Sequence, residues 1–454
     1  MSSFLEAIRV SQVTRTASPN EIGEWLDSHA SETPMTVLQQ PVDSLPEWRC
    51  FDSEGFISHE SGRFFSIAGL QFPNSEFESA CYPAQPIIVQ EDKGILGFLV
   101  TIIDGCLMFL GQAKMEPGNW PPAQLSPTVQ ATTSNFERVH GGSKTLYLDY
   151  FLEQKSPGTA QRTLMSQLQI EQTDRFFGKA NWNMLVEVDE SAQPELDSWF
   201  RWFSLRDLVE LAETTSLLHV DARSVLGSWL SQDRRFAVDQ VSSSQHELHA
   251  WLDAAADSGP GTLVPISHMS EWQIVDGVLK TTNGPMEVLG VQVHAPSRER
   301  THWSQPLVRN VNQGISLLVA SRSGSETQFL VSRQRGPLST GSAIVGPTFS
   351  WEIPPSPDAQ DVVQRTMNGI FPEEEYEVVT DSVQSEEGGR FFRSSTRNII
   401  VWISDFDPTQ QMTWPLDEGS MRWVSVEDLR YLSRIGRRLS IELRSHLSQC
   451  LVWL

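Results

Sequence analysis

The sequence contains few cysteines and no long hydrophobic run. Its four cysteines, Cys50, Cys81, Cys106 and Cys450, show no CxxC spacing and no nearby histidine ladder. We therefore expect neither a structural zinc site nor a disulfide framework, and a reducing cytoplasm is the predicted location. No apolar stretch is long enough to predict a membrane span. The segment "MSSFLEAIRVSQVTR" lacks the apolar region of a secretory signal, so none is expected.

Positive charge is also scarce. Lysine and arginine number 34 against 57 acidic residues, which gives a formal net charge of -23. This excess argues against a nucleic-acid or anionic-membrane partner. A phosphorylated ligand stays possible, because a few local arginines can build an anion site in an acidic protein. The length of 454 residues predicts two or three domains with their own cores.

What the sequence does have is an internal repeat. Strings in the first half recur in the second half in the same order, most of them 215 to 226 residues later. The matched pairs are "SPNEIGEWLDSHA" with "SQHELHAWLDAAA", "WRCFDSEGFI" with "WQIVDGVL", "QPIIVQEDKGILGFLV" with "QPLVRNVNQGISLLV", "QIEQTDRFF" with "QSEEGGRFF", and "RWFSLRDLVEL" with "RWVSVEDLRYL". Conserved order over this length predicts a duplicated module.

Each module reads as an opening helix, several β-rich segments and a closing helix. Ser18 with Glu21, and Ser244 with Glu247, predict capping boxes at the two opening helices. Apolar, partly alternating runs such as "GILGFLVTIID" and "CLMFLGQAK" predict strands. The expected class is α+β, with a mixed β-sheet flanked by helices in each module. Predicted boundaries are an extension over 1–17, modules over 18–232 and 244–454, and a linker over 233–243.

Ordered strings resemble a known family. "SGRFFSIAGL", "QPIIVQEDKGILGFLV", "QAKMEPGN", "QLSPTVQATTSN", "YLDYF" and, in the second half, "QSEEGGRFF" with "TRN" resemble the NDP-hexose 2,3-dehydratases of deoxysugar biosynthesis. The resemblance spans roughly residues 18 to 450. It implies two tandem Nudix-like modules per subunit, a homodimer and no organic cofactor. It also implies an NDP-4-keto-6-deoxyhexose substrate, most often with dTDP, whose unstable 3,4-diketo-2,6-dideoxy product passes to a ketoreductase or aminotransferase.

Loss of water across C2 and C3 beside a C4 ketone sets three chemical requirements. A base must remove the C3 proton, a donor or cation must steady the C4 oxygen, and an acid must assist the C2 hydroxyl. Lys114 and Glu116 in "QAKMEPGN" share one face of an extended chain that ends at Pro-Gly. We predict Glu116 as base or acid and Lys114 as the group near the enolate. The alternative is a surface ion pair beside a turn.

Other polar residues are weaker candidates. Arg63 and Arg390 each follow a glycine and precede two aromatic residues, so either can bind phosphate or merely pair with a carboxylate. His59 titrates near neutrality and is a candidate acid or base, although a lone histidine is often a surface or capping residue. Thr128 is a candidate for binding a sugar hydroxyl, although it recurs as Thr348, which suggests a scaffold role. The remaining predicted substrate-binding residues are Gln130, Tyr147, Tyr150, Glu171, Glu386, Glu387, Arg397 and Asn398.

The two modules differ at these positions. Trp182 stands in the first module where Arg397 stands in the second, and "KMEPG" is replaced by "RQRGP". This alignment identifies Arg335 as the replacement for Glu116, which favours the first module as the site of the chemistry. The second module is then an ancillary pocket or a dimer scaffold.

Two alternatives from other functional classes stay open. One is a catalytically silent nucleotide-sugar-binding partner of another deoxysugar enzyme. The other is a Nudix-type pyrophosphohydrolase, although neither module contains the metal-binding REUxEE string.

Overall fold

The two halves of the chain build two similar mixed β-sheets. The computed structural model describes residues 2–71, 84–132, 145–152, 161–230, 242–254, 260–282, 284–296, 298, 300–323, 326–335, 342–356, 358–371, 376–403 and 419–453. The first seven-stranded sheet comprises β6 (Ile95–Ile103), β7 (Cys106–Met115), β8 (Ala123–Ser126), β9 (Val129–Ala131), β10 (Gln161–Ile170), β11 (Ala180–Val188) and β12 (Phe200–Ser204). The second comprises β18 (Gly314–Ser323), β19 (Glu326–Arg335), β20 (Ala343–Gly346), β21 (Phe349–Trp351), β22 (Tyr376–Ser385), β23 (Ser395–Ile403) and β24 (Met421–Ser425).

Strand order is the same in both sheets. β10-β11-β6-β7-β12 in the first corresponds to β22-β23-β18-β19-β24 in the second, and each sheet has one parallel pair among antiparallel neighbours. The prediction of a duplicated α+β unit with a mixed sheet is therefore confirmed. The predicted apolar strands are the central ones, because both of their faces are covered.

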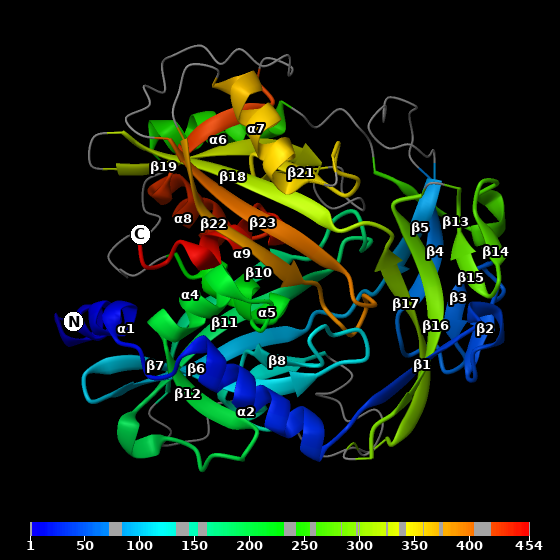
Figure 1. Ribbon diagram of the computed structural model, residues 1–454, viewed down its shortest axis with the longest axis horizontal. Coiled ribbons are helices and arrows are strands. Elements are labelled where there is room, and N and C mark those ends of the chain that lie inside the picture. The colour runs from blue at the N-terminus through cyan, green and yellow to red at the C-terminus, as the bar shows by residue number, and fades with distance from the viewer. Residues whose placement is uncertain are drawn as a thin grey trace.

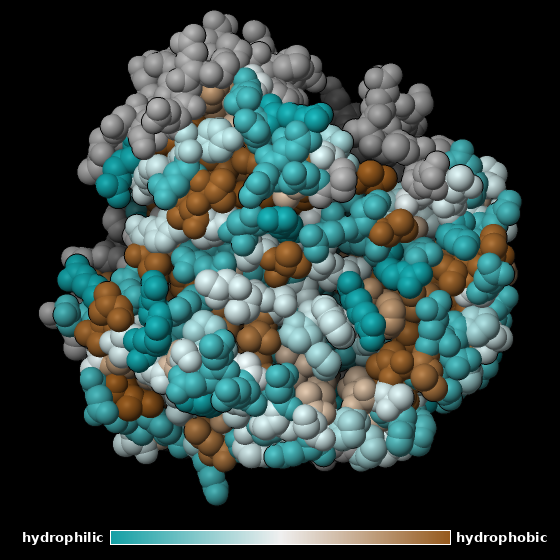
Figure 2. Space-filling view, viewed as in Figure 1, coloured by the Kyte–Doolittle hydropathy of each residue, from teal (hydrophilic) through white to brown (hydrophobic). Residues whose placement is uncertain are grey.

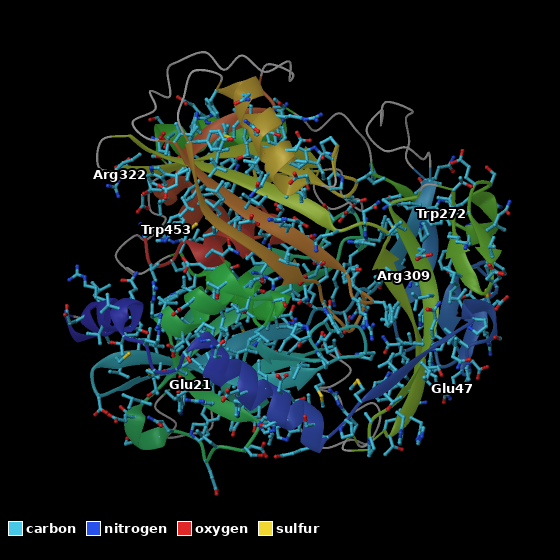
Figure 3. All side chains as sticks on the ribbon, in the orientation of Figure 1. Glu21, Glu47, Trp272, Arg309, Arg322 and Trp453 are labelled. Atoms are coloured by element: carbon cyan, nitrogen blue, oxygen red, sulfur yellow. The ribbon has the colours of Figure 1, made fainter. Side chains whose placement is uncertain are left out.

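The two halves exchange strands in a further pair of small sheets. One small sheet is formed by β2 (Trp48–Cys50), β3 (Ile57–His59), β4 (Ser66–Gln71) and β5 (Ala84–Val89), and β13 (Thr262–Val264) from the second half pairs with β4. The other is formed by β14 (Gln273–Val275), β15 (Val278–Lys280), β16 (Met286–His294) and β17 (His302–Asn310), and β1 (Thr36–Gln40) from the first half pairs with β16. Both small sheets lie on the right of Figure 1, where Figure 3 labels Glu47, Trp272 and Arg309.

Eight helices of the described chain cover and join the sheets. They are α1 (Ser2–Val13), α2 (Pro19–Glu32), α4 (Leu205–Thr214), α5 (Val220–Ser228), α6 (Ser243–Asp253), α7 (Ala359–Ile370), α8 (Val426–Ile435) and α9 (Ile441–Gln449). The predicted extension is itself helix α1, which buries Ala7 and Ile8 in the main core. Most of the predicted linker, 233–241, lies outside the described residues.

The predicted caps are correct for one opening helix and wrong for the other. Ser18 and Glu21 form the expected capping box on α2. In the second half, α6 starts earlier than expected, because the cap is Ser242 with Gln245 rather than Ser244 with Glu247. The run "SSSQHE" offers two serines three residues before an amide or a carboxylate, and the chain uses the first.

A reciprocal pair of buried arginines joins the halves at their centre. Arg223 on α5 donates to the Ser385 carbonyl of the second half at 2.7 Å, and Arg444 on α9 donates to the Ile170 carbonyl of the first half at 2.6 Å. Their side chains have about 1% and 0% of their surface exposed. Figure 1 shows α5 and α9 between the two large sheets.

Arg223→Ala should lower the free energy of unfolding by about 3–5 kcal/mol, because it leaves buried carbonyls without donors and opens a cavity. Arg9→Ala is the control: Arg9 pairs with Glu6, and both side chains are mostly exposed, so its loss should change stability by less than about 1 kcal/mol. Urea unfolding followed by circular dichroism measures both values. Equal midpoints for the two variants would contradict a structural role for Arg223.

In the part of the chain that the structure describes, no helix is both long and apolar enough to cross a bilayer. On the face shown in Figure 2, hydrophilic and hydrophobic residues are interspersed.

Candidate functional site

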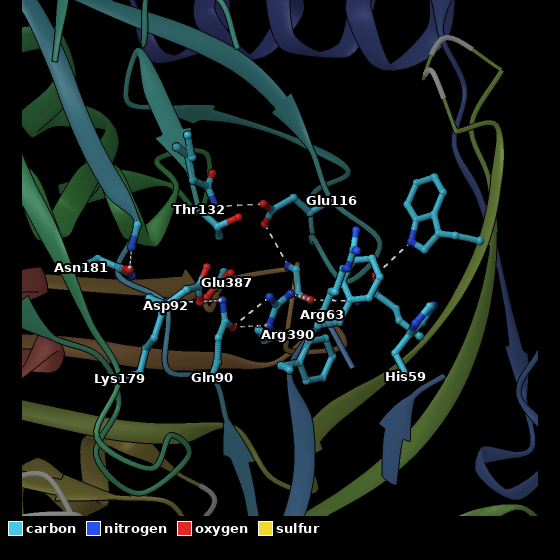
Figure 4. Close-up of a pocket in the computed structure, with 18 of the residues that line it drawn as sticks. His59, Arg63, Gln90, Asp92, Glu116, Thr132, Lys179, Asn181, Glu387 and Arg390 are labelled. Carbon is cyan, nitrogen blue, oxygen red and sulfur yellow. Dashed lines mark hydrogen bonds and ion pairs between the residues drawn. The ribbon is translucent and has the colours of Figure 1, made fainter. Parts of the chain in front are cut away.

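A cavity of about 1250 Å³ opens where the first large sheet meets the two small sheets. Its walls come from both halves of the chain. The first half contributes residues at the ends of β5, β7, β9 and β11, and the second contributes the β16–β17 connection and the loop after β22. Figure 4 shows side chains from these elements pointing into one space.

Glu116 is the most constrained carboxylate in this cavity. Its Oε2 accepts from His219 Nε2 at 3.1 Å and from the Gly389 amide at 3.0 Å, while its Oε1 accepts from Gln130 Nε2 at 3.0 Å. Lys114 Nζ lies 3.9 Å from Oε1. The side chain is only 10% exposed. Since Oε2 already has two donors, Oε1 is the oxygen with acceptor capacity left for a ligand.

The surroundings keep Glu116 ionised. Burial alone raises the pKa of this carboxyl group, but the interactions with His219 and Lys114 outweigh it and hold the pKa well below its usual range. Burial in turn lowers the pKa of the Lys114 ammonium, against the attraction of Glu116. The predicted i and i+2 arrangement at the end of β7 therefore brings both side chains into the cavity rather than to an open surface.

The Pro117-Gly118 turn fixes Glu116 against the second half. The Gly118 amide donates to the Gly388 carbonyl at 2.8 Å, and the Arg393 amide donates to the Gly118 carbonyl at 2.8 Å. A Cβ atom on Gly118 would lie 1.7 Å from the Phe391 carbonyl oxygen, so only glycine fits. This close contact brings the Gly389 amide onto Glu116.

His219 begins helix α5 and serves two partners. Its Nδ1 accepts from the Asp221 amide at 3.2 Å, which caps the helix. Because Nδ1 accepts from the Asp221 amide, Nε2 is the ring nitrogen that donates to Glu116. The imidazole is fully buried, so its orientation is set by these two contacts.

Two other carboxyl groups in the cavity favour the protonated form. Burial raises the pKa of Glu387 to about 7, against the attraction of Arg390. Burial also raises the pKa of Asp221 well above its usual range, and repulsion from Glu387 adds to it. One Asp221 oxygen has no hydrogen-bond partner within the described residues. The site therefore combines an ionised carboxylate with carboxyl groups biased toward neutrality, the arrangement expected of acid–base chemistry.

The cavity lining has a larger share of basic residues than the acidic chain as a whole. Six basic residues, Arg63, Lys114, Lys179, Arg298, Arg300 and Arg390, line it beside five acidic ones, Glu91, Asp92, Glu116, Asp221 and Glu387. In the whole chain, by contrast, 34 basic residues stand against 57 acidic ones. Arg298, from the second half, donates to the Met115 carbonyl at 2.6 Å and so places a guanidinium next to Glu116. Such a setting fits an anionic ligand.

Aromatic residues surround the other end of the cavity. His59 packs edge-on against Trp48 at 5.4 Å between ring centroids and contacts Phe64 at 4.4 Å. The Arg390 guanidinium lies 4.2 Å from the centre of the Phe65 ring. In Figure 4, His59 and Asn181 are on opposite sides of the labelled group.

Several predicted residues lie outside the cavity lining. The Thr128 hydroxyl accepts from the Leu99 amide and donates to the Leu110 carbonyl, and Thr348 repeats this between Val319 and Leu330, so the threonine joins strands in both halves. We correct Thr128 to a scaffold position. The other predicted residues away from this lining are Tyr147 and Tyr150, which border a separate hollow of about 380 Å³, and Glu171, Glu386, Arg397 and Asn398.

Three of these residues form hydrogen bonds or ion pairs within the protein. Glu171 accepts from Asn181 at 2.7 Å, and burial raises its pKa. Glu386 accepts from Thr396 and Gln172, each at 2.9 Å. Arg397 forms a two-pronged pair with Asp381 at 2.6 and 2.7 Å. These contacts tie strands and loops together.

The proposed equivalence of Arg335 and Glu116 is wrong by one position. Met115 pairs with Ala123 across β7 and β8, and Arg335 pairs with Ala343 across β19 and β20. Since the repeat offset at both pairs is the same, Arg335 corresponds to Met115. The true equivalent of Glu116 is residue 336, which lies outside the described residues. The equivalence of Trp182 and Arg397 is confirmed, because they face Ile95 and Ile315 in matching registers.

Sequence reasoning did not find His219, Asp221, Asn181, Lys179 or Arg298. A signal for the first existed. Extending the repeat beyond the closing helix aligns "LHVDARS" with "LSIELRS", so that His219 faces Ser440 at the same helix cap. A histidine replacing an ordinary capping serine in one repeat only suggests a specialised role.

Comparisons with known proteins agree across the whole chain. The family described as NDP-hexose 2,3-dehydratase matches residues 19–229 and again residues 245–451. A dTDP-4-dehydro-6-deoxy-alpha-D-glucopyranose 2,3-dehydratase of Streptomyces violaceoruber is 33% identical over 439 residues, covering 93% of this chain and 95% of the relative. Enzymes of the same name from Saccharopolyspora spinosa and Amycolatopsis orientalis are 33% and 29% identical, covering 93% and 94% of this chain and 89% of each relative.

Among solved structures, a crystal structure of an ADP compounds hydrolase aligns with a TM-score of 0.22 and 12% identity, covering 34% of this chain and 77% of that one. A likeness at this level does not establish a common fold, and the Nudix-like assignment stays a prediction.

Proposed function

The chain belongs to the NDP-hexose 2,3-dehydratase family, and we propose that its cavity removes water across C2 and C3 of a dTDP-4-keto-6-deoxyglucose. The family membership predicted from the sequence is confirmed, and with it the lyase class. The observation that carries the proposal for this site is Glu116, a buried carboxylate held ionised in a cavity with basic walls. The names of the relatives supply the substrate.

We assign proton abstraction at C3 to Glu116 Oε1. The C3 proton is acidic because its removal gives an enolate that extends to the C4 oxygen. Hydrogen bonds from Gln130 to Oε1, and from His219 and Gly389 to Oε2, fix the plane of the carboxylate. Oε1 is therefore already oriented before the substrate binds. Lys114, 3.9 Å from Oε1, is the cation that stabilises the negative charge on the C4 oxygen.

The nucleotide diphosphate would occupy the side of the cavity that carries Arg63, Arg298 and Arg300. Arg298 is bonded to the carbonyl of the residue before Glu116, and the sugar phosphate is attached at C1, next to the reacting C2. Binding the first phosphate there keeps C2 and C3 within reach of the carboxylate. The aromatic side chains of Trp48 and Phe64 offer faces for the nucleobase, so His59 is better suited to that end than to proton transfer.

Removing the His219 donor should shift the pH dependence of the enzyme. In His219→Ala the pKa of Glu116 rises, so the carboxylate protonates at higher pH, and the acid limb of kcat/KM should move up by about one to two pH units. His219→Gln is the matched control, because it also loses the ring that caps α5 but keeps an N–H donor. A pH–rate profile of both variants tests this, and an unmoved acid limb in His219→Ala would reject the assignment.

The function is tested by incubating the protein with dTDP-4-keto-6-deoxyglucose, a 3-ketoreductase and NADPH. A 2-deoxy product supports the dehydratase. Intact sugar nucleotide with saturable binding would instead indicate a silent binding partner, and release of nucleoside monophosphate would indicate a hydrolase.

Within the described ranges, no group of three or more His, Cys, Asp or Glu side chains is arranged to hold a metal ion.

We retain four finer predictions as part of this proposal. They are that the repeated units are Nudix-like, that the protein is a homodimer, that it works in the cytoplasm and that a ketoreductase or aminotransferase consumes its product. The shared strand order of the two large sheets supports the duplication itself, because one repeated unit accounts for it.

A further inference from the structure

A small niche separates two carboxyl groups that come from different halves of the chain. A Cβ atom built on Gly389 would lie 3.1 Å from Glu387 Oε1 and 3.6 Å from Glu116 Oε1. Both oxygens therefore face the space above this glycine, and the distance between them cannot exceed those two distances together. Glu116, Glu387 and Gly389 all line the cavity (Figure 4). The absence of a side chain at 389 keeps the space between the carboxyl groups open.

The two carboxyl groups have complementary surroundings. Glu116 receives three N–H donors and a nearby ammonium, which favour the ionised form. Glu387 has Glu116 and Glu171 as acidic neighbours and Arg390 and Lys179 as basic ones, and burial raises its pKa to about 7. A proton acceptor and a proton donor thus both lie within 3.6 Å of the position that a Cβ atom on Gly389 would take.

We propose that the C2–C3 edge of the keto-sugar lies over Gly389, and that Glu387 of the second half donates the proton that lets the C2 hydroxyl leave as water. This assignment rests on the proposed function. Hydroxide is a poor leaving group, so elimination needs an acid at C2 as well as a base at C3.

The steps balance with these two groups. Glu116 Oε1 takes the C3 proton, and the C–H electron pair forms the C3–C4 enolate with negative charge on the C4 oxygen. The enolate reforms the C4 ketone, the electron pair moves to make the C2–C3 double bond, and the C2–O bond breaks as Glu387 protonates the hydroxyl. One water leaves. Return of the Glu116 proton to C2, with loss of the C3 hydroxyl proton to Glu387, gives the 3,4-diketone and restores both carboxyl groups.

Solvent exchange separates the two roles. In D₂O, Glu387→Gln should still exchange the C3 hydrogen of the substrate for deuterium, because the base is intact, while product formation falls by about 100-fold or more. Glu116→Gln should lose both exchange and product. Glu386→Gln, an acid on the same loop outside the cavity lining, should keep the wild-type ratio of exchange to elimination. NMR of recovered substrate measures exchange, and the coupled reductase assay measures elimination.

Exchange and elimination that fall by the same factor in Glu387→Gln, or that are both unchanged, would overturn the assignment. A wild-type protein that gives neither would instead refute the proposed function itself.

A second variant tests the niche without touching either carboxyl group. Gly389→Ala keeps the amide that donates to Glu116 but places a methyl group between the two oxygens. It should reduce kcat/KM by about 10-fold or more through weaker placement of the sugar, with an unchanged melting temperature. Normal kcat/KM in a folded Gly389→Ala protein would show that the sugar does not lie there.

Discussion

Glu116→Gln should reduce kcat by about 100- to 10,000-fold while leaving the dissociation constant of the sugar nucleotide within about threefold of wild type. The amide is the same size as the carboxylate but cannot accept the C3 proton. Its folded state should persist, because the Gln130 amide can turn to pair with the new group and the Gly389 and His219 donors can still meet its oxygen. Single-turnover kinetics and equilibrium titration separate chemistry from binding.

Glu24→Gln is the control for this experiment. Glu24 is an exposed acid on α2, away from the cavity lining, and its amide variant should have wild-type kcat. If Glu116→Gln kept near-normal kcat, the base would have to be another group. Asp221 and Glu387 are the remaining acidic residues at this end of the cavity, and both favour the protonated form in the free protein.

Gly118→Ala should both destabilise the protein and inactivate it. The added Cβ would meet the Phe391 carbonyl oxygen at 1.7 Å and the Gly388 carbonyl oxygen at 2.8 Å. These are backbone atoms, so the turn and the loop after β22 must separate. We expect a loss of about 3 kcal/mol in the free energy of unfolding. The protein that remains folded should also lose most of its activity. The reason is that moving the turn away from the loop takes the Gly389 amide and the Glu387 side chain away from Glu116.

Gly23→Ala is the matched control for Gly118→Ala. Its Cβ would make an ordinary contact of 3.4 Å with the end of the Leu217 side chain, and alanine in a helix is favoured over glycine. This variant should be as stable as wild type or slightly more so, with unchanged activity. Thermal unfolding and the coupled assay compare the two. Wild-type stability in Gly118→Ala would mean that the contact between turn and loop is looser than the structure describes.

Local sequence rules were enough to identify Lys114 and Glu116 as a candidate pair. Strand alternation placed Lys114 and Glu116 on one face, and the Pro-Gly signal placed them at a strand end, so the pair could be found without a structure. The same rules could not find what contacts that pair. His219 follows Glu116 by 103 residues and Gly389 follows it by 273. Nothing periodic in the sequence encodes such separations, because tertiary packing alone brings these residues together.

In the fold, too, features set by neighbouring residues were predictable and features set by distant residues were not. Apolar runs and capping signals predicted the central strands and α2, since those features depend on near neighbours. They misplaced the cap of α6, where two overlapping serine signals compete over a few residues. Repeat comparison found the duplicated unit but implied two separate modules. The exchange of β1 and β13 between the small sheets was not predicted, because short strands of three to five residues carry no signal for their partner.

That exchange has a consequence for how the chain matures during synthesis. As the first half leaves the ribosome, β4 lacks β13 and β1 lacks β16, because both partners lie beyond residue 261. Until the later segments emerge, β1 and β4 therefore each lack one hydrogen-bonded neighbour. Glu116 likewise lacks its Gly389 donor until residue 389 has been translated. The complete cavity therefore cannot form until most of the second half has been translated.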